Sequence, residues 1–161
     1  MSAQGPTQNE VELAPGEEPV RSDYEHDFYA WLMEQACHVR AGRWQELDRE
    51  NLAEEIESLG REQFNKLESA LRVLLVHMLK WDHQPERRGR SWWASINEHR
   101  LRLDDVLSDN PSLRPRISEA ISRAYRRARL RAVKETDLDE GRFPRDCPYS
   151  WDDITSRDFS V

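Results

Sequence analysis

Residues 48–83 read DRENLAEEIESLGREQFNKLESALRVLLVHMLKWDH, and this stretch decides the fold class. Its large apolar side chains recur at alternating intervals of three and four residues, which is the spacing of one face of a bundled α-helix. Asp48 stands where a helix N-cap is expected, and Pro85 and Gly89 end the pattern. We therefore predict one long helix, with an apolar seam made of Phe64, Leu67, Leu71, Leu74, Met78 and Trp81.

Helical spacing continues on both sides of this stretch. We predict a helix from Ser22 or Asp23 to about Arg40 with Gly42 as its C-cap, and a third helix capped by Ser91. A fourth follows over about 112–137, and a short helix follows Ser150. No window shows the alternation of a β-strand, and the connections are short. The sequence therefore predicts an all-α fold: an antiparallel up-down bundle of about four main helices plus a short C-terminal helix.

Length and composition bound the domain organisation. The 161 residues suffice for one core, so we predict a flexible acidic tail over 1–21 and a single helical domain over 22–161. No apolar stretch approaches the ~20 residues of a membrane span, and the N-terminus lacks the apolar region of a signal peptide. Two isolated cysteines, Cys37 and Cys147, favour a reduced, cytoplasmic location.

Charge is distributed unevenly along the chain, whose net charge is −7. Residues 1–68 hold 6 basic and 16 acidic side chains, whereas residues 69–161 hold 18 and 15, and nearly all of the basic ones are arginine. One interpretation is an anion-binding surface in the C-terminal part. The alternative is an arginine-rich composition set by the genome, with acids interspersed throughout.

Several segments resemble a known family. They are NLAEEIESLG at 51–60, LLVHMLKW followed by QPERR and RSW at 74–92, DNPSL at 109–113, and ET.L with FP..CPYSW at 135–151. Together they make the chain similar, over about 23–160, to the bacterial domain-of-unknown-function family number twenty-nine. The resemblance implies an all-helical fold. It implies no activity and supplies no catalytic residues.

Three glutamates share one face of the long helix. Glu50, Glu54 and Glu57 stand at i, i+4 and i+7, and extending the apolar seam backwards places Glu57 on the core side beside Gly60. One interpretation is a site for a divalent cation such as Mg²⁺, although no cofactor is firmly implied. The alternatives are a structural pair with an arginine or a tryptophan N–H, or a solvated carboxylate if Gly60 breaks the seam.

A second candidate is a buried polar cluster. If the helices on either side of residue 87 pair, His77 faces Asn97 and Arg100, with His99 near them. A single histidine on an apolar face is more often a satisfied core residue than a catalyst, and no nucleophile–base arrangement accompanies it.

The turn KWDHQPERRGRSWW at 80–93 is the third candidate. Arginine forks bind phosphate and tryptophan faces stack on bases, so we predict an anion-binding site. The alternative is that the tryptophans close the end of the bundle and the cations are solvated or paired. The candidate residues are Lys80, Arg87, Arg88, Arg90 and Trp92.

The fourth helix carries a stripe of basic residues. A groove-binding helix looks like this, and so does a solvated face that complements the acidic helix; we favour the second interpretation. Sequence-specific DNA binding is accordingly disfavoured. The stripe comprises Arg116, Arg123, Arg126, Arg127, Arg129, Arg131 and Lys134.

Two functions follow from these candidates. The favoured one is a non-catalytic binding module that contacts a protein or a phosphate-bearing partner through residues 80–93. The alternative is a metal-dependent hydrolase of a nucleotide or phosphodiester that uses Glu50, Glu54 and Glu57. Whether the chain is an enzyme stays open. A homodimer is compatible with the spacing, which does not separate a seam within one chain from a seam between two.

Overall fold

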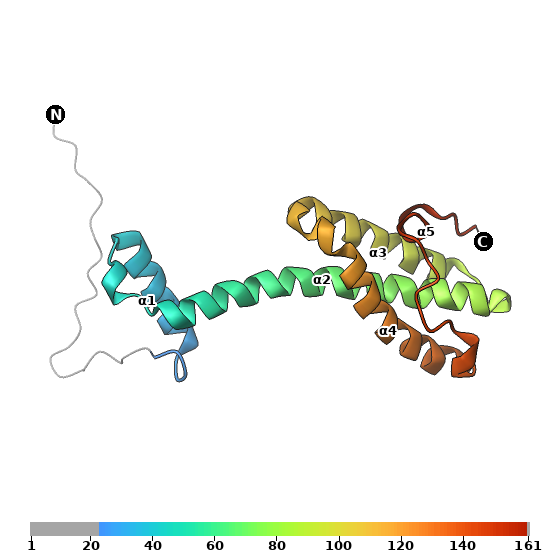
Figure 1. The fold of residues 1–161 in the computed structure, drawn as a ribbon, viewed down its shortest axis with the longest axis horizontal. Coiled ribbons are helices and arrows are strands. Elements are labelled where there is room, and N and C mark those ends of the chain that lie inside the picture. Colours follow the sequence, from blue (N-terminus) through green and yellow to red (C-terminus); the bar gives the residue numbers. More distant parts are fainter. Residues whose placement is uncertain (1–22, 161) are drawn as a thin grey trace, which may run out of the picture. The chain divides into compact units, whose positions relative to one another are not determined.

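The computed structural model describes residues 23–160, and the regular elements among them are helices (Figure 1). The elements are α1 (Phe28–Ala41), α2 (Arg49–His83), α3 (Arg90–Asp109), α4 (Ile117–Thr136) and α5 (Trp151–Ser156). Short 3-10 turns lie at Trp44–Glu46, Pro85–Arg87, Pro111–Arg116 and Glu140–Arg142. No strand occurs between residues 23 and 160. The predicted all-α class, with four main helices and a short C-terminal one, is confirmed; the predicted tail over 1–21 lies outside the described residues.

The chain divides by its internal contacts into two compact units, Met1–Glu55 and Ile56–Val161. The sequence predicts a single domain over 22–161, whereas this division falls within α2. The first unit is described over 23–55 and the second over 56–160. Each unit has its own packing.

The second unit contains the hydrophobic core. The predicted seam of α2 is confirmed, because all six of its side chains from Phe64 to Trp81 are at most 4% exposed. Figure 1 shows α3 and α4 on the C-terminal half of α2, where Ile96, Leu103 and Leu107 of α3 join the same core. The segment after α4 completes it with Phe143, Ile154 and Phe159.

Small side chains set how closely α4 approaches the core. Four of its six buried residues are alanines, each fully buried; the other two are Tyr125 and Thr136. Because alanine is small, the α4 backbone lies close to the neighbouring elements on this side, and no larger side chain would fit. The long arginine side chains of α4 therefore lie on the remaining sides of the helix. The alanine stripe comprises Ala120, Ala124, Ala128 and Ala132.

Aspartates organise the start of α1, which begins later than predicted. Asp23 accepts hydrogen bonds from the backbone of Glu25 and His26 at 3.2 and 2.8 Å and so holds a separate turn. The N-cap is Asp27, whose carboxylate accepts from the Ala30 N–H at 2.9 Å. The predicted start at residue 22 or 23 is therefore wrong by about one turn. Gly42, with φ of 69°, is the predicted C-cap.

Two further helix starts differ from expectation. Gly89 precedes α3 in an extended conformation, and Ser91 lies inside the helix and does not cap it. Pro115 has no N–H to donate, and the chain forms a 3-10 turn over Pro111–Arg116 before α4 begins at Ile117. The predicted Ser150 cap of α5 is confirmed by a reciprocal capping box with Asp153.

The apolar seam does not extend backwards past Phe64. The Glu57 side chain is 74% exposed, so its predicted position on the core side is wrong. A Cβ built at Gly60 would meet nothing within 4 Å, so no other helix between residues 23 and 160 packs against this position. Ile56 and Leu59 are each 61% exposed in the same stretch. Among the described residues, no helix has the length and apolar character needed to cross a bilayer.

Candidate functional site

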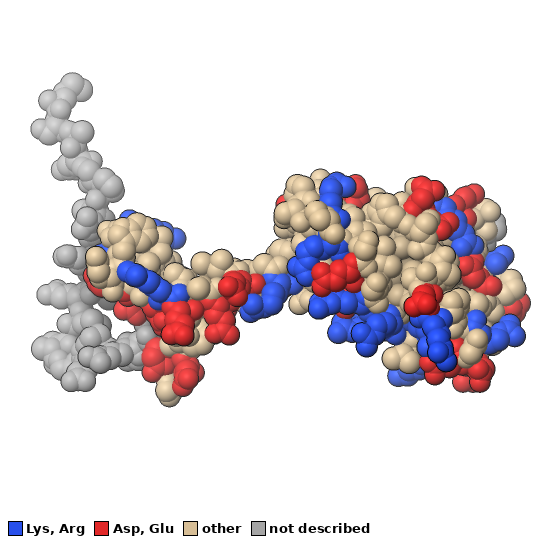
Figure 2. Space-filling model, viewed as in Figure 1, with Lys and Arg blue, Asp and Glu red and all other residues tan. Residues whose placement is uncertain are grey.

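Two adjoining grooves lined by basic side chains flank the outward face of α4 in the second unit. Their volumes are about 550 and 600 Å³, and they share Arg127 and Leu130. Figure 2 shows Lys and Arg side chains gathered along α4, interrupted by a few carboxylates. Together the grooves are lined by Arg72, Arg123, Arg126, Arg127, Arg129, Arg131, Lys134 and Arg145, with Glu68, Glu135 and Leu130.

Local structure explains why these cations converge. Most of them lie on α4 at intervals of three or four residues, the spacing of neighbours on one helix surface, and the alanine stripe turns that surface outward. Two come from elsewhere: Arg72 from α2, and Arg145 from the segment that follows α4. The grooves are therefore a product of tertiary packing around a basic helix.

Some of the groove cations already have acidic partners. Arg127 pairs with Glu68 of α2 at 2.5 Å, and Arg131 pairs with Glu135 at 2.7 Å. Arg129 pairs with Glu140 at 2.5 Å and also donates to backbone carbonyls, so it fastens the segment after α4. The α2–α4 ion pair at Glu68 supports the interpretation that the basic stripe complements α2.

Other cations of the grooves form no ion pair with a described residue. Arg126, Lys134 and Arg145 are exposed, and none forms an ion pair with another described residue. The Nε–H of Arg72 is buried and finds no acceptor among the described residues. This surface can hold an anion without first breaking an internal pair.

The Arg/Trp turn at 80–93 is only partly available. Lys80 donates to Glu135 at 2.8 Å and lies 4.8 Å from the centre of the Trp92 ring. Arg88 donates to the backbone carbonyl of Trp81 at 2.8 Å. Arg87, Arg88 and Arg90 are all exposed and form no ion pair with another described residue. Only Arg87 and Arg90 also lack a side-chain hydrogen bond there.

The predicted polar cluster does not form as a linked group. The His77 Nδ1 lies 2.9 Å from the Val73 carbonyl, and Asn97 donates to the carbonyl of Trp93 at 2.9 Å. Arg100 instead donates to carbonyls of the α5 region, among them Ile154 at 2.8 Å. No hydrogen bond joins these three side chains within the described part of the chain.

Burial governs the chemistry of these side chains. It lowers the pKa of His77, which favours a neutral imidazole, and it also lowers the pKa of Arg100. Both groups bond to backbone oxygens, so their contacts are those of structural residues. His77 is half-buried, and its ring nitrogen has a backbone partner one turn back on α2.

The predicted carboxylate face is exposed and dispersed. Glu50, Glu54 and Glu57 are all exposed, and Glu57 lies 3.4 Å from Arg61 one turn along α2. No group of three or more His, Cys, Asp or Glu side chains within residues 23–160 is arranged to hold a metal ion. The solvated carboxylate, one of the alternatives for Glu57, is the one that the structure supports.

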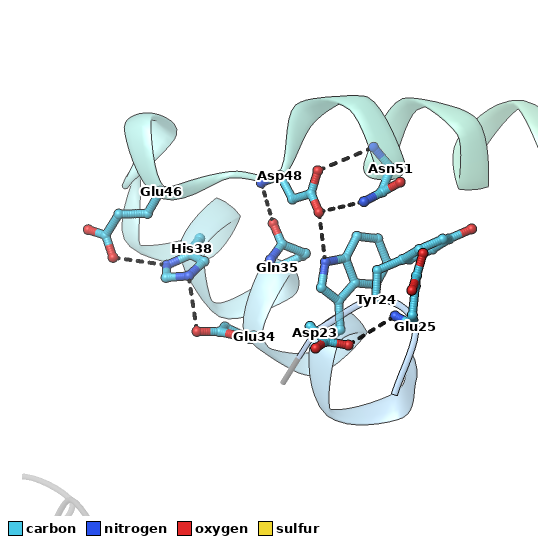
Figure 3. Close-up of a pocket in the computed structure, with 10 residues that line it drawn as sticks. Asp23, Tyr24, Glu25, Glu34, Gln35, His38, Glu46, Asp48 and Asn51 are labelled. Carbon is cyan, nitrogen blue, oxygen red and sulfur yellow. Dashed lines mark hydrogen bonds and ion pairs between the residues drawn. The ribbon is translucent and has the colours of Figure 1, made fainter. Parts of the chain in front are cut away.

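The first unit contains a pocket of about 530 Å³ that the sequence does not reveal (Figure 3). Asp48 organises one wall. Its carboxylate accepts from the Trp31 indole at 3.3 Å and from the Asn51 side chain at 2.7 Å, while its backbone N–H donates to Gln35 at 2.9 Å. These bonds hold the pKa of Asp48 below its ordinary value, with the Asn51 side chain as the main cause. From the sequence, Asp48 could be predicted only as the N-cap of the long helix, and not as part of a pocket.

His38 forms the other wall of this pocket. Its ring lies between two carboxylates, 3.7 Å from Glu34 and 3.4 Å from Glu46, and its side chain is 10% exposed. Figure 3 shows the two carboxylates on opposite sides of the ring. The pocket's acidic and aromatic side chains are thus largely engaged with one another, which makes it a structural joint between α1 and the start of α2.

Sequence reasoning identified the arginine stripe of α4 but not the grooves. The stripe is visible because residues on one helix are neighbours in the sequence. Arg72 and Arg145 lie outside α4, and only the folded chain brings them to it. The basic stripe, which includes the exposed Arg126, was therefore the only sequence feature that pointed to the grooves.

Comparison with known proteins identifies a family. The family described as Domain of unknown function DUF29 matches residues 24–160, which is nearly the whole described chain. No curated protein and no solved structure matches the sequence. The match confirms the resemblance carried by the segments between residues 51 and 151. The chain therefore belongs to the DUF29 family.

Proposed function

We propose that this protein is a binding module that holds the phosphate backbone of a nucleic acid on the two basic grooves of α4. The observation that carries the proposal is the composition of the grooves: eight cationic side chains and two carboxylates, in a chain whose net charge is −7. Such a local excess of positive charge attracts a polyanion although the whole molecule is acidic.

The shape of the basic surface supports a linear ligand. From Arg123 to Lys134 the α4 axis rises about 16 Å at ~1.5 Å per residue. A nucleic-acid strand carries one phosphate per ~3.4 Å of helix axis, so about five phosphates fit along this length. Arginine pairs with phosphate oxygens through two parallel hydrogen bonds.

The lining of the grooves favours backbone contact without base recognition. It contains no aromatic side chain on which a base could stack, and Leu130 is its single large apolar residue. Protein interfaces need an apolar or aromatic centre, which a surface with one leucine does not supply. The grooves also lack histidine, cysteine and hydroxyl side chains, so their chemistry is that of binding.

Paired charge reversals test the proposal. In Arg126→Glu/Arg145→Glu, two exposed cations of the groove become acidic. We expect the affinity for a fluorescent single strand of about 20 nucleotides, measured by anisotropy, to fall about tenfold or more. The slope of log K against log salt should shrink by about 1.4, since each lost phosphate contact removes about 0.7.

Arg87→Glu/Arg90→Glu is the matched control. It makes the same change of charge at two exposed arginines of the Arg/Trp turn that also lack an ion pair among the described residues. We expect this variant to bind almost like the unmodified chain. Loss of binding in the control alone would place the contact in the turn, and absence of binding by the unmodified chain at low salt would refute the proposed function.

A further inference from the structure

The first unit has almost no apolar core. Among residues 23–55, Trp31 is the one hydrophobic side chain that is fully buried; the other buried side chains there are Gln35 and His38. A unit with so little buried apolar surface gains little stability from its own core. The first unit has no disulfide, since Cys37 is a free, exposed thiol.

A large apolar face of α1 is open to solvent. Phe28, Tyr29, Met33 and Val39 are 45%, 74%, 50% and 43% exposed. At about 100° per residue, these positions lie on one side of the helix together with Leu32 and Ala36, which are half-buried. The opposite side, which carries Trp31, Gln35 and His38, faces the pocket.

This face of α1 carries no acidic side chain; its one charged residue is the exposed Arg40, whose helix position falls between those of Tyr29 and Met33. The acidic residues of α1 and its cap, Glu34 and Asp27, lie at helix positions on the pocket side. Two copies of the face can therefore approach each other without bringing carboxylates together, even though the first unit is rich in acid.

We infer that the apolar face of α1 packs against the same face of a second copy of this chain. The pairing is isologous, because one surface patch supplies both halves of the contact. Residues 1–22 are a poor alternative cover, since Val11, Leu13 and Val20 are their largest aliphatic side chains after Met1 and they contain no aromatic residue.

The exposed area limits the strength of this association. If a fully exposed large side chain offers about 150–250 Å², the four most exposed residues of the face supply about 400 Å² per copy. The pair then buries about 800 Å², below the ~1,200 Å² of standard stable interfaces. We therefore expect a dimer that forms and dissociates with protein concentration.

Sedimentation velocity of the full chain tests the inference. We expect the mean mass to rise from monomer to dimer as the concentration increases, and Tyr29→Glu to shift this transition at least about tenfold higher, since a charge must then be buried. Met33→Glu should act in the same way. Leu101→Glu on α3 is the matched control, because Leu101 is 69% exposed and lies in the second unit; it should leave the transition unchanged.

Three outcomes would overturn the inference. They are a full chain that stays monomeric at all concentrations, a dimer that Tyr29→Glu and Met33→Glu do not weaken, and a dimer that Leu101→Glu weakens equally. Circular dichroism of each variant confirms that its helices are intact, and Met33→Glu serves if Tyr29→Glu fails to fold. Dimerisation through α1 is independent of nucleic-acid binding on α4, so each can fail without the other.

Discussion

Asp82 shows at the residue scale how one half-buried carboxylate closes the second unit. It accepts hydrogen bonds from Tyr149 at 2.9 Å and from both terminal nitrogens of Arg157 at 2.9 and 2.6 Å. Burial by itself raises the pKa of Asp82, but the bonds from Arg157 and Tyr149 outweigh it and hold the pKa below its ordinary value. α2 is thereby fastened to the C-terminal segment.

Asp82→Asn should destabilise the second unit by about 1–2 kcal/mol. The amide cannot accept all three bonds, and Arg157 loses its counter-charge, although partial solvent access moderates the loss. Urea unfolding followed by circular dichroism measures the change. Asp104→Asn, at an exposed position of α3 without an ion pair among the described residues, should stay within about 0.5 kcal/mol of the unmodified chain.

The same carboxylate predicts a pH dependence. The pKa of Asp82 is lowered on folding, so the charged form stabilises the native state above the unfolded pKa of about 4. This stabilisation is lost as the pH falls from about 4 through the folded pKa. The difference in unfolding free energy between the unmodified chain and Asp82→Asn should therefore be constant near neutral pH and shrink below about pH 4. A difference that instead grew on acidification would contradict the assignment.

At the scale of the element, the two sides of α4 have opposite requirements. Its inward side carries alanines that leave no space, and its outward side carries the arginines that line the grooves. Helix packing fixes the first side by volume, whereas solvent and charge govern the second. Exposed members of the basic surface that form no ion pair among the described residues, such as Arg126, can therefore vary without disturbing the core, but the alanines cannot.

Ala128→Leu should destabilise the second unit by about 1–3 kcal/mol or more. Ala128 is fully buried, and added methylenes in a close-packed interior force backbone or side-chain shifts. Thermal or urea unfolding measures the effect. Ala94→Leu, an exposed alanine of α3, is the control and should be nearly neutral. Equal effects at both sites would show that helix propensity, and not volume, explains the loss.

Hydrophobic periodicity predicts a helix well, but it predicts poorly which other elements pack against that helix. The 3,4 spacing predicts α2 and the buried side chains from Phe64 to Trp81, because burial of that face is what the spacing encodes. The same reasoning fails at Glu57, where the helix continues without a helix packed against it. The late start of α1 has a local cause, since Asp23 and Asp27 are both good caps and the sequence does not rank them.

At the scale of the whole molecule, hydrophobic burial is concentrated in one of the two units. The core cluster lies entirely within residues 64–159, while the first unit has Trp31 and a polar network around Asp48. Local stability follows the number of buried apolar contacts, so the two units should differ in how readily they open.

Hydrogen exchange should show this difference directly. At a concentration where the chain is monomeric, we expect amides of α1 to exchange much faster than those of α2 beyond Phe64, which lie in the core. Mass spectrometry of peptides from both helices measures the rates. Protection of α1 equal to that of the core would show that the first unit is stabilised by something other than its own side chains.

The candidate site was predictable only where its residues share a helix. The arginines of α4 stand out in the sequence, but Arg145 and Arg72 join them through folding. In the Arg/Trp turn, the cations look equivalent in the sequence. In the structure, however, Lys80 pairs with Glu135 on another helix, whereas Arg87 forms no ion pair with a described residue. Partners that lie 55 residues away decide which charges are available.

Gly60 has an evolutionary consequence. Glycine in an exposed helix interior weakens the helix by about 1 kcal/mol relative to alanine, and nothing within 4 Å requires the absence of a Cβ there. Selection removes variants that fall below the stability needed for function and does not accumulate stability beyond it. Gly60 therefore indicates that the free energy of unfolding of this protein exceeds what function requires by enough to tolerate a helix-weakening residue that has no packing role among the described residues.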